Sequence, residues 1–134
     1  MDWKIEVIPV PVTDVDRAKH FYADQLGFAV DLDTKIGGDI RLVQLTPPGS
    51  GCSIHLSIGI VTMPPGVLEG LQITVADIEA ARVHLVANGV EASPVRHMAD
   101  GEWVDGHGGD WNAFLFFSDP DGNGWVLQER PATA

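Results

Sequence analysis

The chain has 134 residues, of which 45% are hydrophobic, and its 8 basic and 19 acidic residues give a formal net charge of −11. This length is enough for a single domain with a hydrophobic core. The negative charge opposes binding to nucleic acids and to anionic membrane surfaces, and no apolar run reaches the roughly 20 residues of a membrane-spanning helix. The same charge favours a cationic small molecule as a partner, although solubility alone also explains it.

The cellular location is predicted from two absences in the sequence. Cys52 is the only cysteine, which rules out an intrachain disulfide. The N-terminal sequence MDWKIEVIPV has no basic start followed by a long apolar segment, as a signal peptide would have. We therefore expect a cytoplasmic protein.

The first half of the chain is predicted to fold as a strand, a helix and further strands. Residues 5–12 form a β-rich run, and the prolines within it lack N–H donors, which predicts an edge strand or an interrupted hydrogen-bond ladder. Asp14 is placed as the helix N-cap, and Gly27 ends the helix. The helix carries one apolar stripe, formed by Val15, Ala18, Phe21, Tyr22 and Leu26. Residues 41–45 and 52–60 are predicted strands, separated by the turn TPPGSG.

The second half begins in the same way. Residues 70–75 form a predicted strand, Asp77 caps the following helix, and Gly89 ends it. The apolar stripe of this helix consists of Ile78, Ala81 and Leu85.

The chain then continues into an irregular segment and two closing strands. Residues 97–111 are rich in glycine and acidic residues and show no periodicity, so we expect a long loop there. Residues 112–117 and 124–129 are predicted strands, and the sequence SDPDGNG between them is typical of a tight turn.

The two halves are related to each other in sequence. VTDVDRAKHF begins at Val12 and VADIEAARVH begins at Val75, and both place an acidic helix start and apolar positions at the same spacing. Such internal similarity predicts a duplicated βαβββ unit. We place module one at residues 1–62 and module two at residues 66–134, within a single domain that spans residues 1–134.

These motifs together resemble a known family. A V-x-D helix start, an FY-x5-LGF stretch, a second V-x-D start and a DPDGN turn are combined in the glyoxalase/bleomycin-resistance/extradiol-dioxygenase family, also called the vicinal oxygen chelate superfamily. The resemblance covers nearly the whole chain. It implies an α+β fold of paired βαβββ modules whose curved mixed sheets enclose a cleft, and it implies a homodimer.

Metal-dependent members of that family place four ligands on strands, and the resemblance carries these over to particular residues. Three of the positions fall on Val7, Gly70 and Val126, whose side chains offer no donor atom. The fourth falls on His55 or, from the internal repeat, on Ser53, and this choice remains open. A transition-metal site needs three or four N, O or S donors. We therefore expect no bound metal and no other cofactor, which disfavours metal-dependent isomerisation and ring cleavage.

Polar side chains are predicted to line the implied cleft instead. Because strand side chains alternate, Gln72 and Gln128 share the face of the lost ligand positions, and Ser53 shares that of His55. Such neutral hydrogen-bonding groups suit an organic ligand. The alternative is that they satisfy one another or water. His55 is also a candidate general base, with a structural role as the alternative.

Tryptophans near the predicted long loop are further candidates. Trp103 and Trp111 flank its glycine-rich part, and their rings could stack on a planar aromatic ligand or hold a cation. The alternative is packing within the protein or against a partner. Trp125 has the opposite strand parity to Val126 and is predicted to lie in the core. His97 and His107 share the loop with carboxylates but match no metal-ligand spacing.

The leading functional hypothesis is a metal-independent protein that binds and sequesters an aromatic or cationic natural product such as an antibiotic. Its predicted ligand-binding residues are His55, Gln72, Trp103, Trp111, Gln128 and Ser53. Whether the protein is also an enzyme remains open. The alternative is a lyase or isomerase of the same family, either metal-free with His55 as the acid/base or using metal ligands not identified by the motif.

Overall fold

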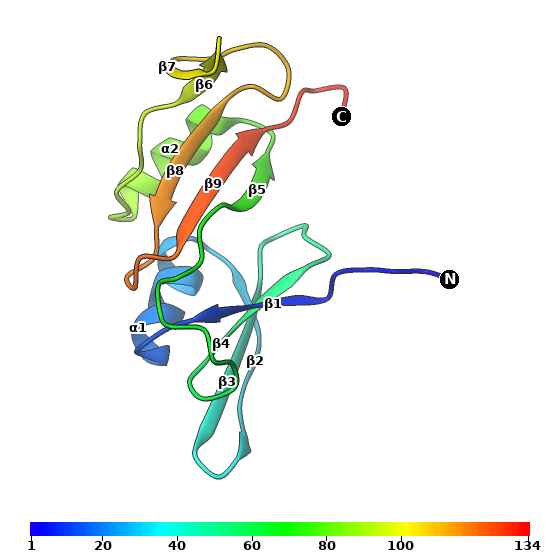
Figure 1. The fold of residues 1–134 in the computed structure, drawn as a ribbon, viewed down its shortest axis with the longest axis vertical. Helices are drawn as coiled ribbons and strands as arrows, with labels where there is room; N and C mark the ends of the chain where they lie inside the picture. The colour runs from blue at the N-terminus through cyan, green and yellow to red at the C-terminus, as the bar shows by residue number, and fades with distance from the viewer. The chain divides into compact units, whose positions relative to one another are not determined.

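A computed structural model describes all of residues 1–134, which divide into two compact units. The first unit comprises Met1–Leu68 together with the short segment Asp119–Asn123, and the second comprises Glu69–Ser118 and Gly124–Ala134. Figure 1 labels the helices and strands of both units. The chain therefore returns to the first unit for five residues between the last two strands of the second.

The first unit is a helix packed on a four-stranded mixed sheet. Its strands lie in the order β1-β4-β3-β2, with β1 parallel to β4 and the other pairs antiparallel. The strand β1 lies at the sheet edge, as its two prolines predicted. In chain order the elements are β1 (Val7–Pro11), α1 (Val15–Lys19), its π-helical continuation η1 (His20–Gln25), β2 (Ala29–Gly37), β3 (Ile40–Thr46) and β4 (Ser53–Ser57).

The helix of the first unit begins and ends where the sequence predicted. The Asp14 carboxylate accepts a hydrogen bond from the backbone N–H of Arg17 at 3.1 Å, which satisfies one of the free donors of the first turn. Gly27 adopts a φ of +88° and ends the helix, since a residue without Cβ takes this conformation at no steric cost. The predicted stripe faces the sheet, with Val15, Ala18, Phe21 and Tyr22 buried.

The second unit repeats this arrangement with one more strand. Its order is β5-β9-β8-β6-β7, with β5 parallel to β9 and the remaining pairs antiparallel. The elements are β5 (Leu71–Val75), α2 (Ile78–Ala87), β6 (Arg96–Ala99), β7 (Glu102–Asp105), β8 (Phe114–Ser118) and β9 (Gly124–Glu129). Asp77 caps α2, and Trp125 is buried and stacks on Phe117, so both predictions are confirmed.

The prediction of one long loop over residues 97–111 is wrong for its first part. There β6 and β7 form an antiparallel hairpin, in which Met98 pairs with Trp103. Asp100 and Gly101 make the two-residue turn, with φ values of +51° and +78°. Two positive φ angles suit the right-handed twist of the flanking strands, and Asp-Gly is a preferred pair for such a turn.

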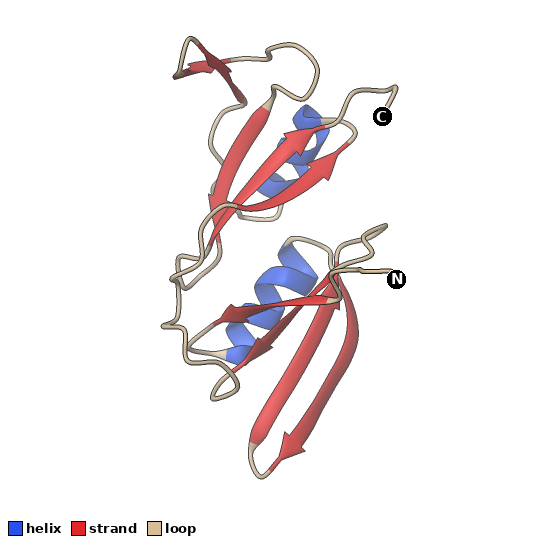
Figure 2. Cartoon of the chain, turned by 45° about the vertical axis from the view of Figure 1, so that its right-hand side comes forward, coloured by secondary structure: helices blue, strands red, loops and turns tan.

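In each unit the helix lies on one face of the sheet, as Figure 2 shows, and no helix of the same unit covers the other face. The prediction of an α+β fold with mixed sheets is therefore confirmed. We call these uncovered surfaces the open faces. No helix of the structure combines the length and the apolar character needed to cross a membrane.

Candidate functional site

The open face of the second unit is set by strand register. Paired residues on neighbouring strands point to the same side of a sheet. Phe116 pairs with Val126, which in turn pairs with Gln72, and Phe114 pairs with Gln128. The alternate residues Leu115, Phe117, Trp125 and Leu127 are buried on the helix side. The open face therefore presents apolar and amide side chains together.

An aromatic cluster occupies one part of this open face. The ring of Trp103 lies edge-on to Phe114 and Phe116, with ring centroids 5.3 Å and 5.1 Å apart. This T-shaped geometry is a favoured one for aromatic pairs. Trp103 is nevertheless 45% exposed. The cluster thus offers a rigid aromatic surface that a flat ligand ring can contact.

A chain of amide hydrogen bonds lies beside the cluster. The Gln72 Nε2 donates to Gln128 Oε1 at 2.6 Å, and the Gln128 Nε2 donates to the backbone carbonyl of Trp111 at 2.8 Å. The structure therefore brings together three of the predicted binding residues, although Trp111 contributes its backbone to this contact. Phe114 and Phe116 were missed by the sequence reasoning. Their alternation within NAFLFF, on the same parity as Gln128, was the available signal.

Three side chains hold the segment that carries Trp111. The His97 Nδ1 lies 2.8 Å from the Gly106 carbonyl oxygen. The Asn112 side chain accepts from the Met98 N–H and donates to its carbonyl, as a strand partner would. His107 lies 3.3 Å from a carboxylate oxygen of Glu79.

These contacts fix residues 106–112 against the hairpin and the helix. Trp111 itself has a φ of +62°, a conformation that costs energy for a residue with a large side chain. Such strain at a single position is common in binding sites, where the surrounding contacts hold it.

The remaining predicted residues lie on the open face of the first unit. His55 lies in the middle of β4, flanked by Pro9 on β1 and Gln44 on β3. Its Nδ1 is buried and has no hydrogen-bond partner. Burial lowers the pKa of His55 from its ordinary value of 6.5, because desolvation disfavours the charged ring. Ser53, two residues earlier, lies 2.6 Å from the Thr46 hydroxyl, so its hydrogen-bonding capacity is partly used.

The side chains do not fit the metal site that the family resemblance implies. Val7, Gly70 and Val126 supply no donor atom, and no group of three or more His, Cys, Asp or Glu side chains is arranged to hold a metal ion. A single imidazole or hydroxyl falls short of the donor set that Zn²⁺, Mn²⁺ or Fe²⁺ requires.

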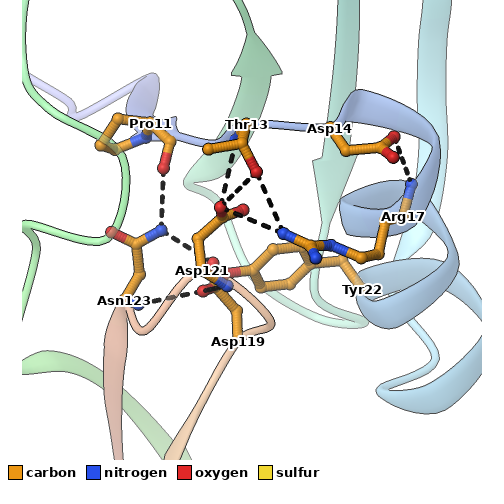
Figure 3. Close-up of polar contacts among 8 residues, drawn as sticks. All are labelled: Pro11, Thr13, Asp14, Arg17, Tyr22, Asp119, Asp121 and Asn123. Carbon is orange, nitrogen blue, oxygen red and sulfur yellow. Dashed lines mark hydrogen bonds and ion pairs between the residues drawn. The ribbon is translucent and has the colours of Figure 1, made fainter.

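The DPDGN turn has a scaffolding role, shown in Figure 3. The Asp119 carboxylate accepts from the Tyr22 hydroxyl at 2.6 Å and from the Asn123 side chain at 2.8 Å. The Asp121 carboxylate accepts from the hydroxyl of Thr13 at 2.6 Å and pairs with Arg17 at 3.2 Å. Although Asp-x-Asp-x-Asn resembles the start of a calcium-binding loop, these groups are used to attach the turn to β1 and α1.

Comparison with known proteins agrees with this geometry. The sequence model of the Glyoxalase/Bleomycin resistance protein/Dioxygenase superfamily matches residues 4–127. The chain belongs to this superfamily. The side chains without donor atoms at Val7, Gly70 and Val126 thus occur in a chain that belongs to the superfamily.

Several solved structures resemble this member of the superfamily over nearly its whole length. TnmS3, an antibiotic binding protein from Streptomyces sp. CB03234, is 32% identical with a TM-score of 0.77, over 96% of this chain and 97% of its own. A glyoxalase/bleomycin resistance protein from the same organism is 33% identical, with a TM-score of 0.73 over 93% and 99%. A superfamily member from Sphaerobacter thermophilus DSM 20745 is 26% identical, with a TM-score of 0.78 over 96% and 98%.

Proposed function

We propose that this protein binds and sequesters a planar aromatic small molecule, such as an antibiotic, without a bound metal. The observation that carries the proposal is the aromatic cluster of Trp103, Phe114 and Phe116 beside the amides of Gln72 and Gln128. Ligand sites typically combine a mainly apolar surface with a few placed polar groups. Ser53 and His55 remain proposed ligand-binding residues on the open face of the first unit.

Three further observations support this proposal. TnmS3, at 32% identity, is described as an antibiotic binding protein, and its likeness extends over nearly the whole chain. The net charge of −11 favours neutral or cationic ligands over anionic ones. The missing donors at Val7, Gly70 and Val126 support metal independence.

The test is substitution of the most exposed ring of the cluster. Trp103→Ala removes the edge-on contacts to both phenylalanines, so binding of an aromatic ligand, measured by calorimetric titration, should weaken by about tenfold or more. Trp3→Ala is the matched control, because Trp3 is 83% exposed near the N-terminus and should leave the affinity unchanged. Equal affinities of the Trp103→Ala variant and the wild type would rule out stacking on this cluster.

A second candidate function rests on one observation, the unpaired Nδ1 of His55. With its pKa lowered by burial, the ring is neutral at pH 7 and could accept a proton from a bound substrate. We infer that any enzymatic activity would be a proton transfer or isomerisation through His55. His55→Gln would then abolish turnover while ligand binding persists, whereas unchanged turnover would exclude this role.

We also propose a cytoplasmic homodimer. The strand β2 is an edge strand without a buried residue, and it exposes apolar side chains, namely Val30, Leu32 and Ile36. Such an edge invites pairing with another chain. Light scattering coupled to gel filtration should give the mass of two chains, and the mass of one chain across the micromolar range would contradict the dimer.

A further inference from the structure

On the open face of the second unit, the chain of hydrogen bonds from Gln72 through Gln128 to the Trp111 carbonyl has a fixed donor-to-acceptor direction. A side-chain amide can usually be turned over, because its oxygen and nitrogen look alike. Here the backbone carbonyl of Trp111 removes that freedom, because a carbonyl oxygen can only accept a hydrogen bond. The group of Gln128 that contacts it at 2.8 Å must therefore be the Nε2 donor.

The orientation of the Gln128 amide also fixes the orientation of the Gln72 amide. With Nε2 of Gln128 facing Trp111, its Oε1 faces Gln72. The group of Gln72 that lies 2.6 Å from this oxygen must then be its own Nε2. The Oε1 of Gln72 is left as the end of the chain, with no hydrogen bond from the protein, and Gln72 is exposed.

We propose that Gln72 Oε1 is the specificity-determining group of the proposed site, and that it selects aromatic ligands carrying a hydrogen-bond donor, such as a phenolic hydroxyl. The inference rests on the proposed function and narrows its ligand class. Successive hydrogen bonds polarise one another, which makes the terminal oxygen a better acceptor than an isolated amide. A ligand that presents only an ether or carbonyl oxygen there would place two acceptors against each other and leave both unpaired.

The neighbouring groups are consistent with this selection. The aromatic cluster of Trp103, Phe114 and Phe116 lies on the same sheet face, because Phe116 pairs with Val126 and Val126 pairs with Gln72. A ring resting on the cluster can therefore direct a substituent toward Gln72. The net charge of −11 acts against a ligand whose substituent is itself anionic, such as a carboxylate.

The experiment compares two matched probes, 2-naphthol and 2-methoxynaphthalene, which share the same rings but differ in the presence of a donor. Titration followed by the indole N–H signals in nitrogen-correlated NMR spectra gives both dissociation constants. The wild type should bind 2-naphthol about two- to tenfold more tightly, as expected for one neutral hydrogen bond. Gln72→Met, which keeps the length of the side chain, should remove the preference for 2-naphthol and make the two constants equal.

The outcomes test the selection by Gln72 and the proposed binding of aromatic ligands separately. Equal binding of the two probes by the wild type, or a preference for the ether, would overturn the selection by Gln72 and leave aromatic binding standing. Absence of binding by either probe would overturn the proposed function itself.

A measurement on the free protein tests the direction of the chain independently of any ligand. Scalar coupling across the hydrogen bonds should connect Gln128 Nε2 with the Trp111 carbonyl carbon. Coupling from Gln128 Nε2 to the Gln72 side-chain carbonyl would show the reverse direction and contradict the inference.

Discussion

His55 is a partly buried titratable side chain on a sheet that otherwise buries apolar groups and two serines. The Nδ1 of its ring has no partner, and burial lowers the pKa of the ring from the ordinary value of 6.5. In the unfolded chain the ring regains that ordinary value. Below pH 6.5 the unfolded state therefore binds more protons than the folded state until the lowered pKa is reached.

This difference in proton binding predicts that His55 makes the stability of the protein depend on pH. The free energy of unfolding should fall as the pH is lowered through 6.5, with a slope limited to one proton, about 1.4 kcal/mol per pH unit, and reduced by partial solvent exposure. His55→Gln should lose this component, which urea unfolding at each pH can measure. If wild type and variant keep the same difference in stability as the pH is lowered, His55 is not desolvated in the folded protein.

Single residues also show how far sequence reasoning extends. The caps Asp14 and Asp77 and the buried Trp125 were predictable, because each depends on neighbours within one element. The DPDGN turn was recognised as a turn, yet its partners Tyr22 and Thr13 lie about a hundred positions earlier in the chain. Local pattern carries no information about such distant pairings.

Among the elements, the sequence pattern concealed the β6–β7 hairpin and the strand β2 (Ala29–Gly37). The glycine and acidic residues of the hairpin segment suggest a loop, while the Asp100-Gly101 pair is a signal for a hairpin turn. The hairpin matters for the candidate site, because Trp103 contacts Phe114 and Phe116 from the second strand of this hairpin. Of the proposed binding surface, Trp103 could therefore be predicted as a single residue, but the aromatic cluster could not.

The linker after β4 passes close under the DPDGN turn, and this predicts unequal effects of one substitution at two glycines. A Cβ on Gly66 would lie 2.1 Å from the Asp121 carbonyl oxygen, while a Cβ on Gly59 would meet nothing within 4 Å. Both residues have positive φ, so alanine at Gly59 should cost only the backbone strain, about 1–2 kcal/mol. Alanine at Gly66 adds a clash with backbone and should cost about 2–5 kcal/mol.

Urea unfolding of the Gly66→Ala and Gly59→Ala variants gives both values under the same conditions. Gly59→Ala serves as the matched control, since it shares the sign of φ but not the contact. A cost at Gly66 no larger than that at Gly59 would show that the linker does not pass against the turn.

The whole chain is a duplicated α+β unit that belongs to a superfamily with enzymes among its members. Its side chains nevertheless lack the donor atoms of the metal site that the family resemblance implies. The superfamily includes enzymes by name, and its model matches residues 4–127. The internal repeat predicted a duplicated unit, and the structure shows that the two sheets share one strand order, with an additional strand β7 in the second. The chemistry could not be inherited with the fold, because function depends on the site residues, and three of the four implied ligand positions carry no donor atom.

Metal-independent binding is tested most directly by titrating protein that has been stripped of metal with aromatic ligands. Protein treated with a chelator and checked by elemental analysis would be titrated calorimetrically with 2-naphthol and larger planar aromatic compounds, before and after addition of Zn²⁺, Ni²⁺ or Mn²⁺. We expect the metal-free protein to bind, with affinity unchanged by added metal and lowered by Trp103→Ala. Binding that appears only after a metal is added would show that the protein needs a metal to bind its ligand.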